Sequence, residues 1–224
     1  MLAFSRKVTF ILVVLSVVLT SCEIEARPPS IPVINSGTPA PAKKVLGSFQ
    51  PIDGTPYQLA SISAVSDGRG ESYDFSRLLS EGRSDYGVYN YVFFDVETET
   101  VYPLLPNNET LIYSTQGYPL PQDTDVEKVP VAWWLYTLIK EDTDKDKDFS
   151  YLDKKTLAVS DVGGQGYAEV ITGVDQVLGD AFKDGGVLLI IYRADGKNFL
   201  AHIDLAARKV TKITELPSFG EDVK

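Results

Sequence analysis

The residues best suited to chemistry lie in one acidic segment, residues 142–153. Aspartates occupy every second position from Asp142 to Asp148, and Ser150 and Asp153 follow. Calcium is bound by six to eight hard oxygens, and carboxylates at alternate positions of a tight loop can converge on one point. The segment therefore predicts one structural Ca²⁺ site. The alternative is a solvated acidic hairpin whose charge is offset by Lys145, Lys147, Lys154 and Lys155.

This segment resembles the twelve-residue calcium loop of EF-hand proteins. The resemblance implies metal ligands at positions 1, 3, 5, 7, 9 and 12, which are Asp142, Asp144, Asp146, Asp148 (through its carbonyl), Ser150 and Asp153. Phe149 matches the apolar residue of the family. Lys147 departs from it by replacing the glycine of the sharp turn, and Asp153 is shorter than the usual glutamate. Because residues 133–139 have the pattern of a strand, we expect this loop to join strands, as in some calcium-binding propellers.

The sequence offers little for catalysis. His202 is the only histidine, and it lies in an alternating segment that predicts a half-exposed structural side chain. The chain contains no Gly-x-Ser-x-Gly elbow, phosphate-binding loop or dinucleotide fingerprint. The glycine-rich residues 163–166 precede a strand, so they predict a turn. Carboxylates such as Asp175 and Asp180 could serve a glycosidase, but nothing in the sequence selects them.

Trp133 and Trp134 are adjacent in a predicted strand, so their side chains point to opposite faces. We expect one of them in the core. The other is a candidate for a sheet interface or for a surface that stacks against sugar or protein.

The N-terminus has the pattern of a bacterial lipoprotein signal. Arg6 and Lys7 precede an apolar run over residues 8–19, which is too short to span a bilayer and fits a signal peptide. The end of this segment, Leu19-Thr20-Ser21-Cys22, resembles the lipobox of bacterial lipoproteins. The resemblance implies a signal peptide over residues 1–21, cleavage before Cys22, and modification of that cysteine with lipid such as palmitate.

Residues 22–44 follow as a proline-rich segment without hydrophobic periodicity, which predicts an extended tether between the lipid anchor and a body at residues 45–224. Glu23 replaces the aspartate that retains enteric lipoproteins in the inner membrane. The resemblance therefore favours the outer membrane, at its periplasmic or surface face. Loss of residues 1–21 would change the formal charge from −10 to −12.

Composition excludes several classes of protein. The chain has 31 acidic and 21 basic residues with no basic run in its body, which argues against nucleic acid as a partner. One cysteine cannot form an internal disulfide, and one cysteine with one histidine cannot form a Cys/His zinc cluster.

Short runs of β-branched and aromatic residues predict an all-β body. The clearest candidates for strands are residues 89–95, 131–139, 156–160, 187–192 and 199–205. Asp195-Gly196 predicts a tight hairpin between the last two. Asp184-Gly185-Gly186 and Asn107-Asn108 also predict turns. The one predicted helix is short, residues 75–79, with Asp74 as its N-cap.

Three segments of the chain repeat one pattern. Asp95, Asp161 and Asp204 each end a predicted strand, and apolar residues follow six and nine positions later. Asp161 and Asp204 are 43 residues apart, which matches the ~40–45 residues of a four-stranded propeller blade. Asp95 and Asp161 are 66 residues apart, so we expect an insertion between them.

Residues 157–164 resemble the hairpin of TolB-like propeller repeats, and the acidic loop also occurs in uncharacterised bacterial envelope lipoproteins that this chain resembles. The expected architecture consists of antiparallel meanders. They form either a propeller-like fold of three to four blades, which can be incomplete, or a two-sheet β-sandwich.

These features favour a lipid-anchored protein of the cell envelope that acts as a non-enzymatic binding or scaffold module. Its expected partners are the membrane, through the anchor, and an envelope protein or glycan. The alternative is an envelope enzyme or binding protein that acts on glycan or peptidoglycan through surface carboxylates and tryptophan.

Overall fold

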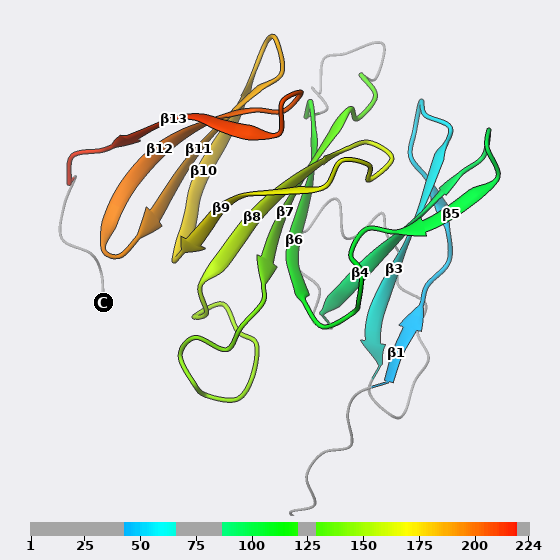
Figure 1. Cartoon of the computed structure of the whole chain (residues 1–224), viewed down its shortest axis with the longest axis horizontal. Coiled ribbons are helices and arrows are strands. Elements are labelled where there is room, and N and C mark those ends of the chain that lie inside the picture. Colours follow the sequence, from blue (N-terminus) through cyan, green and yellow to red (C-terminus); the bar gives the residue numbers. More distant parts are fainter. Residues whose placement is uncertain (1–42, 66–86, 121–128, 219–224) are drawn as a thin grey trace, which may run out of the picture. The chain divides into compact units, whose positions relative to one another are not determined.

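Antiparallel β-strands provide all the regular structure in the residues that the computed structural model describes, which are 43–65, 87–120 and 129–218 (Figure 1). These residues belong to one compact unit. They include no helix with the length and apolarity needed to cross a membrane. The predicted signal peptide, Cys22 and the short helix at residues 75–79 lie outside the described residues.

The strands form two sheets. The nine-stranded sheet contains β1 (Lys43–Leu46), β2 (Gln50–Pro51), β3 (Tyr57–Val65), β4 (Val88–Asp95), β5 (Thr100–Pro103), β6 (Leu111–Tyr118), β7 (Trp133–Ile139), β8 (Lys155–Asp161) and β9 (Ala168–Val174). Its order is β1-β3-β4-β6-β7-β8-β9, with β2 paired to β3 and β5 paired to β4. The four-stranded sheet contains β10 (Gln176–Lys183), β11 (Val187–Ala194), β12 (Lys197–Asp204) and β13 (Lys209–Glu215), in that order.

The nine-stranded sheet consists of two meanders with a thin seam between them. Strands β4 and β6 are paired through Val88 and Ile112 alone, whereas the other neighbours in the order have longer registers. We therefore distinguish meander 1 (β1–β5), meander 2 (β6–β9) and meander 3 (β10–β13). Strand β1 begins at Lys43, two residues before the predicted start of the body.

The expected fold class is confirmed. Each of the five strand candidates lies within or largely overlaps an observed strand. Asp195 and Gly196 join β11 to β12 with φ angles of 49° and 74°, as a tight hairpin with two left-handed residues requires. Both sheets are open, an arrangement that fits an incomplete propeller or a sandwich.

The insertion expected between Asp95 and Asp161 is in meander 2. Its connections over residues 119–132 and 140–154 are long, whereas β10–β11 and β11–β12 in meander 3 are joined by residues 184–186 and 195–196. The second of the long connections is the acidic segment. It projects from one end of β7 and β8 as a wide loop (Figure 1).

Each repeated aspartate closes the turn after its strand. Asp95 accepts hydrogen bonds from the N–H groups of Glu97 and Thr98, and Asp204 accepts one from Ala207. Asp161 accepts one from Gln165. A short carboxylate that satisfies free N–H groups is well suited to a turn, so the repeat has a local structural cause.

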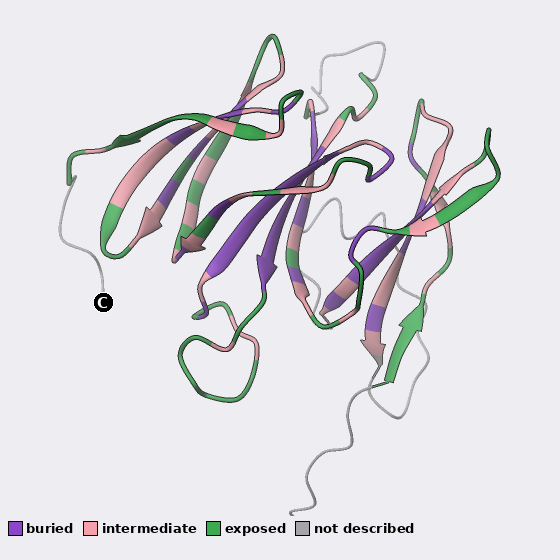
Figure 2. Ribbon diagram, viewed as in Figure 1, coloured by how far each residue is buried: buried purple, intermediate pink, exposed green. Residues whose placement is uncertain are grey.

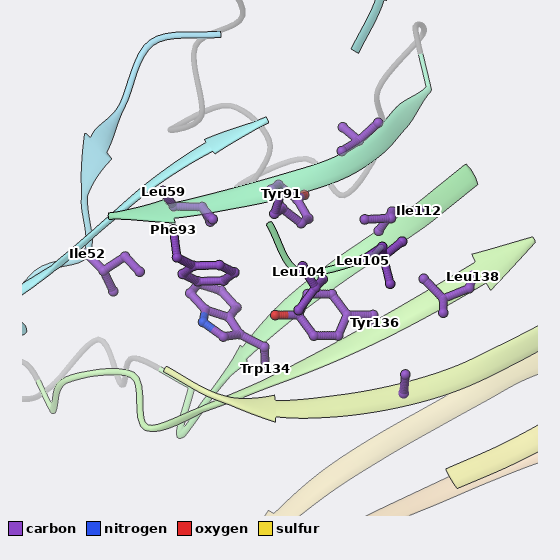
Figure 3. Packing of buried hydrophobic residues seen from close by; sticks show 12 residues of the cluster. Ile52, Leu59, Tyr91, Phe93, Leu104, Leu105, Ile112, Trp134, Tyr136 and Leu138 are labelled. Atoms are coloured by element: carbon purple, nitrogen blue, oxygen red, sulfur yellow. The ribbon is translucent and has the colours of Figure 1, made fainter. Parts of the chain in front are cut away.

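Two clusters of buried side chains hold the meanders together. The first joins meanders 1 and 2 and includes Phe93, Trp134 and Tyr136, which Figure 3 shows with their neighbours. The second joins meander 2 to meander 3 and includes Leu157 and Ile190. Strand β8 lies between the two clusters and is buried along almost its whole length (Figure 2).

The two sheets are also linked by an almost continuous strand. Strands β9 and β10 are separated by Asp175 alone, and the chain changes sheet there. The Asp175 N–H donates to the carbonyl of Arg193 in meander 3. Asp175 is therefore at the junction between the sheets.

Candidate metal centre

The acidic loop joins β7 to β8, so it is not part of a helix–loop–helix. Asp142, Asp144 and Asp146 each place one carboxylate oxygen within 4.8 Å of the other two. Three of the six predicted ligands thus come together. Asp142 is half-buried and the other two are exposed. Such a group of hard oxygens can bind a cation from the solvent side.

The backbone of the loop is folded around these carboxylates. Asp142 accepts hydrogen bonds from the N–H groups of Lys145 and Lys147, at 2.6 and 2.8 Å. Asp144 and Asp146 accept from the N–H groups two residues further on. Lys147, which replaces the glycine of the EF-hand turn, has a φ of 79°, so the chain takes the left-handed turn despite its Cβ.

Asp153 has a different position from the three grouped aspartates. Its carboxylate is fully buried and accepts hydrogen bonds from the N–H groups of Thr143 and Ser150, at 2.6 and 2.8 Å. It also accepts from the Thr143 hydroxyl and the Asp144 N–H. These bonds tie the beginning of the loop to its end. Its role as a metal ligand stays a prediction.

Asp148 and Ser150 were predicted to bind metal through a carbonyl and a hydroxyl. The Asp148 side chain is exposed, and its N–H donates to Asp146. The Ser150 hydroxyl is half-buried and accepts from the Leu152 N–H. Both assignments stay predictions.

Lys155 anchors the base of the loop. Its side chain is 6% exposed, and its ammonium group donates to the carbonyls of Tyr151, Asp153 and Asp175, at 2.6, 2.7 and 2.9 Å. Burial lowers the pKa of this ammonium. The neighbouring Lys154 forms ion pairs with Asp175 and with Asp195 of the β11–β12 turn. The loop is thus attached to the junction between the sheets.

The electrostatics of the loop favour a cation. The hydrogen bond from the Asp146 N–H lowers the pKa of the Asp144 carboxyl, but desolvation and the charges of Asp146 and Asp153 outweigh it and raise that pKa. A divalent cation among the carboxylates would remove the repulsion between them.

The glycine-rich segment at the other end of β8 is filled by protein. A Cβ atom at Gly163 would lie 2.7 Å from the Tyr57 ring, and one at Gly164 would overlap the Phe93 ring. A Cβ atom at Gly166 would overlap the Arg208 guanidinium. The turn is therefore packed against side chains of meanders 1 and 3. This explains its glycines, and the prediction of a turn is confirmed.

The two tryptophans occupy opposite faces of β7, as predicted. Trp134 is 1% exposed, lies in the first core cluster, and donates its indole N–H to the Val162 carbonyl. It is therefore not on a binding surface. Trp133 is half-buried, and the Arg208 guanidinium lies over its ring at 6.0 Å.

The remaining candidates have simpler positions. His202 is half-buried on β12, on the side opposite the buried Ala201 and Ile203, in agreement with the structural interpretation. Asp180 accepts a hydrogen bond from the buried Tyr118 hydroxyl. Sequence reasoning missed the anchoring role of Lys155, because nothing in the sequence distinguishes a buried lysine from an exposed one.

No protein-family model and no curated protein matches this chain. Among solved structures, the β-propeller domain of the trilobed protease from Pyrococcus furiosus, described as having an open velcro topology, aligns with a TM-score of 0.37 and 11% identity. The alignment covers 79% of this chain and 44% of the other.

Proposed function

We propose that this protein is a non-enzymatic binding or scaffold module of the bacterial cell envelope, anchored by lipid at Cys22 and braced by one Ca²⁺ ion in its acidic loop. The observation that carries the calcium assignment is the convergence of Asp142, Asp144 and Asp146 within 4.8 Å. The left-handed Lys147 supports it, since the residue at this position has the turn that the EF-hand glycine provides.

The position of the loop supports a structural role for the ion. Asp153 and Lys155 fix the base of the loop, and Lys154 connects it to Asp195 in meander 3. An ion bound above this base would restrain the wider part of the loop, where the three carboxylates now repel each other. We therefore expect calcium to stabilise the protein rather than to open it.

Isothermal titration calorimetry of the purified protein with CaCl₂ tests the metal site. We expect one ion per chain and loss of binding in Asp142→Asn/Asp144→Asn/Asp146→Asn. Asp184→Asn/Asp204→Asn is the control, because it removes two carboxylates from turns of meander 3. Absence of heat up to millimolar calcium, or equal losses in the control, would contradict the proposal.

The lipid anchor needs a separate test, because the lipobox is the feature that supports it. We expect a radiolabelled or clickable palmitate analogue to label the wild-type protein in a bacterial host but not Cys22→Ala. Fractionation is expected to place the labelled protein in the outer membrane. Labelling of the Cys22→Ala variant, or a soluble wild-type protein, would contradict the anchor and leave the calcium result unaffected.

The binding role is tested by affinity capture of the tagged protein from detergent-solubilised envelope. We expect an envelope protein or a glycan to co-purify reproducibly. Turnover of peptidoglycan or polysaccharide that an Asp or Glu substitution abolishes would instead support the enzymatic alternative.

A further inference from the structure

Meander 3 carries a surface with a chemistry different from that of the acidic loop. In β11 and β12, fully buried side chains alternate with side chains that point the other way, since Leu188, Ile190, Ala201 and Ile203 are all 0% exposed. We call the opposite side the outer face of β10–β13. Its large apolar side chains on β11 and β12 belong to neither core cluster of the described residues; they are Val187, Leu189, Ile191 and Leu200.

Basic side chains surround this apolar centre. Directly paired residues share a face of an antiparallel sheet. The register pairs Lys209 with Asp204, Lys212 with His202 and Lys183 with Val187, and Arg193 lies on the same side as Ile191. Asp204 is the one acid that the described strands of this sheet place there, and its carboxylate accepts from the Ala207 N–H. The cations come from three strands, so the sequence shows no basic run.

An apolar centre with a charged rim is the composition of a protein–protein interface. Ile191 is 39% exposed, although it is in the middle of a central strand. The chain has ten more acidic than basic residues, yet basic side chains lie around the edge of this face. The face therefore fits an acidic, partly apolar partner.

The β4–β5 hairpin of the same chain exposes apolar and acidic side chains, which is the composition expected of a partner for this face. Val96 and Val101 are 48% and 59% exposed. Val101 is paired with Phe94, whereas Tyr102 is paired with the buried Phe93, so Val101 points away from the first core cluster. The turn between the strands carries Glu97 and Glu99, which are both exposed.

We propose that the outer face of β10–β13 binds the β4–β5 hairpin of a second copy of this chain. The valines would cover the Leu189–Ile191 centre, and the glutamates would meet the lysines of β13. This contact joins two different surfaces, so in a pair one copy keeps its hairpin free and the other keeps its outer face free. Contacts of this kind extend into filaments or close into rings. An anionic membrane fits less well, because the formal charge of −10 opposes adsorption.

The test is the mass of the full chain by sedimentation equilibrium, in low and high salt. We expect the wild type to self-associate and high salt to weaken it. Lys209→Glu/Lys212→Glu and Glu97→Lys/Glu99→Lys are each expected to weaken association at least tenfold. The chain that carries all four substitutions is expected to regain it, because the charges are again complementary.

Mixing the two double variants gives a sharper result. One variant has an acidic face and an acidic hairpin, and the other has a basic face and a basic hairpin. We expect the mixture to associate although neither variant does so alone, with the two variants in equal amounts, since each face is complementary only to the hairpin of the other variant. Lys43→Glu/Lys140→Glu changes two exposed lysines outside both surfaces and serves as the control.

A wild-type chain that is monomeric at millimolar concentration in low salt would overturn the proposal. Effects equal to those of the control would also overturn it. Binding to phosphatidylglycerol vesicles that Lys209→Glu/Lys212→Glu abolishes, without self-association, would assign the face to a membrane instead.

Discussion

Strand β8 has a polar segment at each end, and the two segments are built in opposite ways. Before the strand, the acidic loop folds around its own carboxylates, and three of them converge. After the strand, the glycine turn is filled by Tyr57, Phe93 and Arg208 from the neighbouring meanders. The comparison teaches that the glycines serve packing, whereas the aspartates bring three carboxylate oxygens within 4.8 Å of one another, the arrangement from which we propose a cation site.

The largest effect is expected at the glycine turn. Gly164→Ala would place a Cβ against the Phe93 ring at a φ of 78°, so both overpacking and a left-handed backbone oppose it. We expect a loss of about 2–5 kcal/mol in the free energy of unfolding, measured with urea. Gly196→Ala is the control, because its φ is 74° but nothing lies within 4 Å. Equal losses in the two variants would show that the turn is not packed.

The second-largest effect is expected on the thermal stability of the protein when calcium is added. If the acidic loop is incomplete without a cation, calcium at 100 times its Kd stabilises the protein by about 2.7 kcal/mol. We expect the melting temperature to rise with calcium in the wild type and in Gly196→Ala, and to stay constant in Asp142→Asn/Asp144→Asn/Asp146→Asn. Magnesium at the same concentration is the control cation. An equal rise with calcium in the triple variant would place the ion elsewhere.

The Lys155→Met variant distinguishes two effects of Lys155 on calcium binding: its hydrogen bonds at the base of the acidic loop, and its positive charge. Loss of the ammonium leaves one buried carbonyl, that of Asp153, and two partly buried ones without this donor, at a cost of about 1–3 kcal/mol. Charge alone predicts tighter calcium binding, since a cation near the site is gone. We expect weaker binding by calorimetry, because the loop loses its base. Lys140→Met, at an exposed lysine, is the control. Tighter binding in Lys155→Met would show that the lysine acts only through its charge.

The smallest effect is a change in the dependence of stability on pH. The pKa of Asp153 is lowered in the folded protein, because hydrogen bonds to its carboxylate outweigh the effect of burial. Its contribution is therefore fully present above the ordinary pKa of about 3.9 and is lost as the pH falls through the lower folded value. Asp153→Asn is expected to lose about 1–2 kcal/mol at pH 7 and less at pH 3, by urea unfolding. A loss independent of pH would contradict this assignment.

Periodicity and turn residues were enough to predict the meanders. Asp195-Gly196 predicted a hairpin, because a tight turn there needs two left-handed residues. The spacing of Asp161 and Asp204 predicted the length of one repeat. The seam between β4 and β6 could not be predicted, since a single residue pair leaves no pattern in a sequence.

The candidate site was predicted in part. The alternation of Asp142, Asp144 and Asp146 is local, so their convergence followed from the sequence. The buried Lys155 ammonium bonds to the carbonyl of Asp175, which is distant in the sequence. The basic outer face was missed for the same reason, because strand register and not sequence proximity brings its lysines together.

The seam also has a consequence for amide hydrogen exchange. Meanders 1 and 2 are held together by the first core cluster, while Val88 and Ile112 provide the only strand pairing between them in the part of the chain that the structure describes. Side-chain packing can loosen without breaking a ladder of hydrogen bonds, so this boundary is where the nine-stranded sheet opens at the lowest free energy. Amides along β7 and β8 are expected to remain protected while those of meander 1 exchange as a separate group.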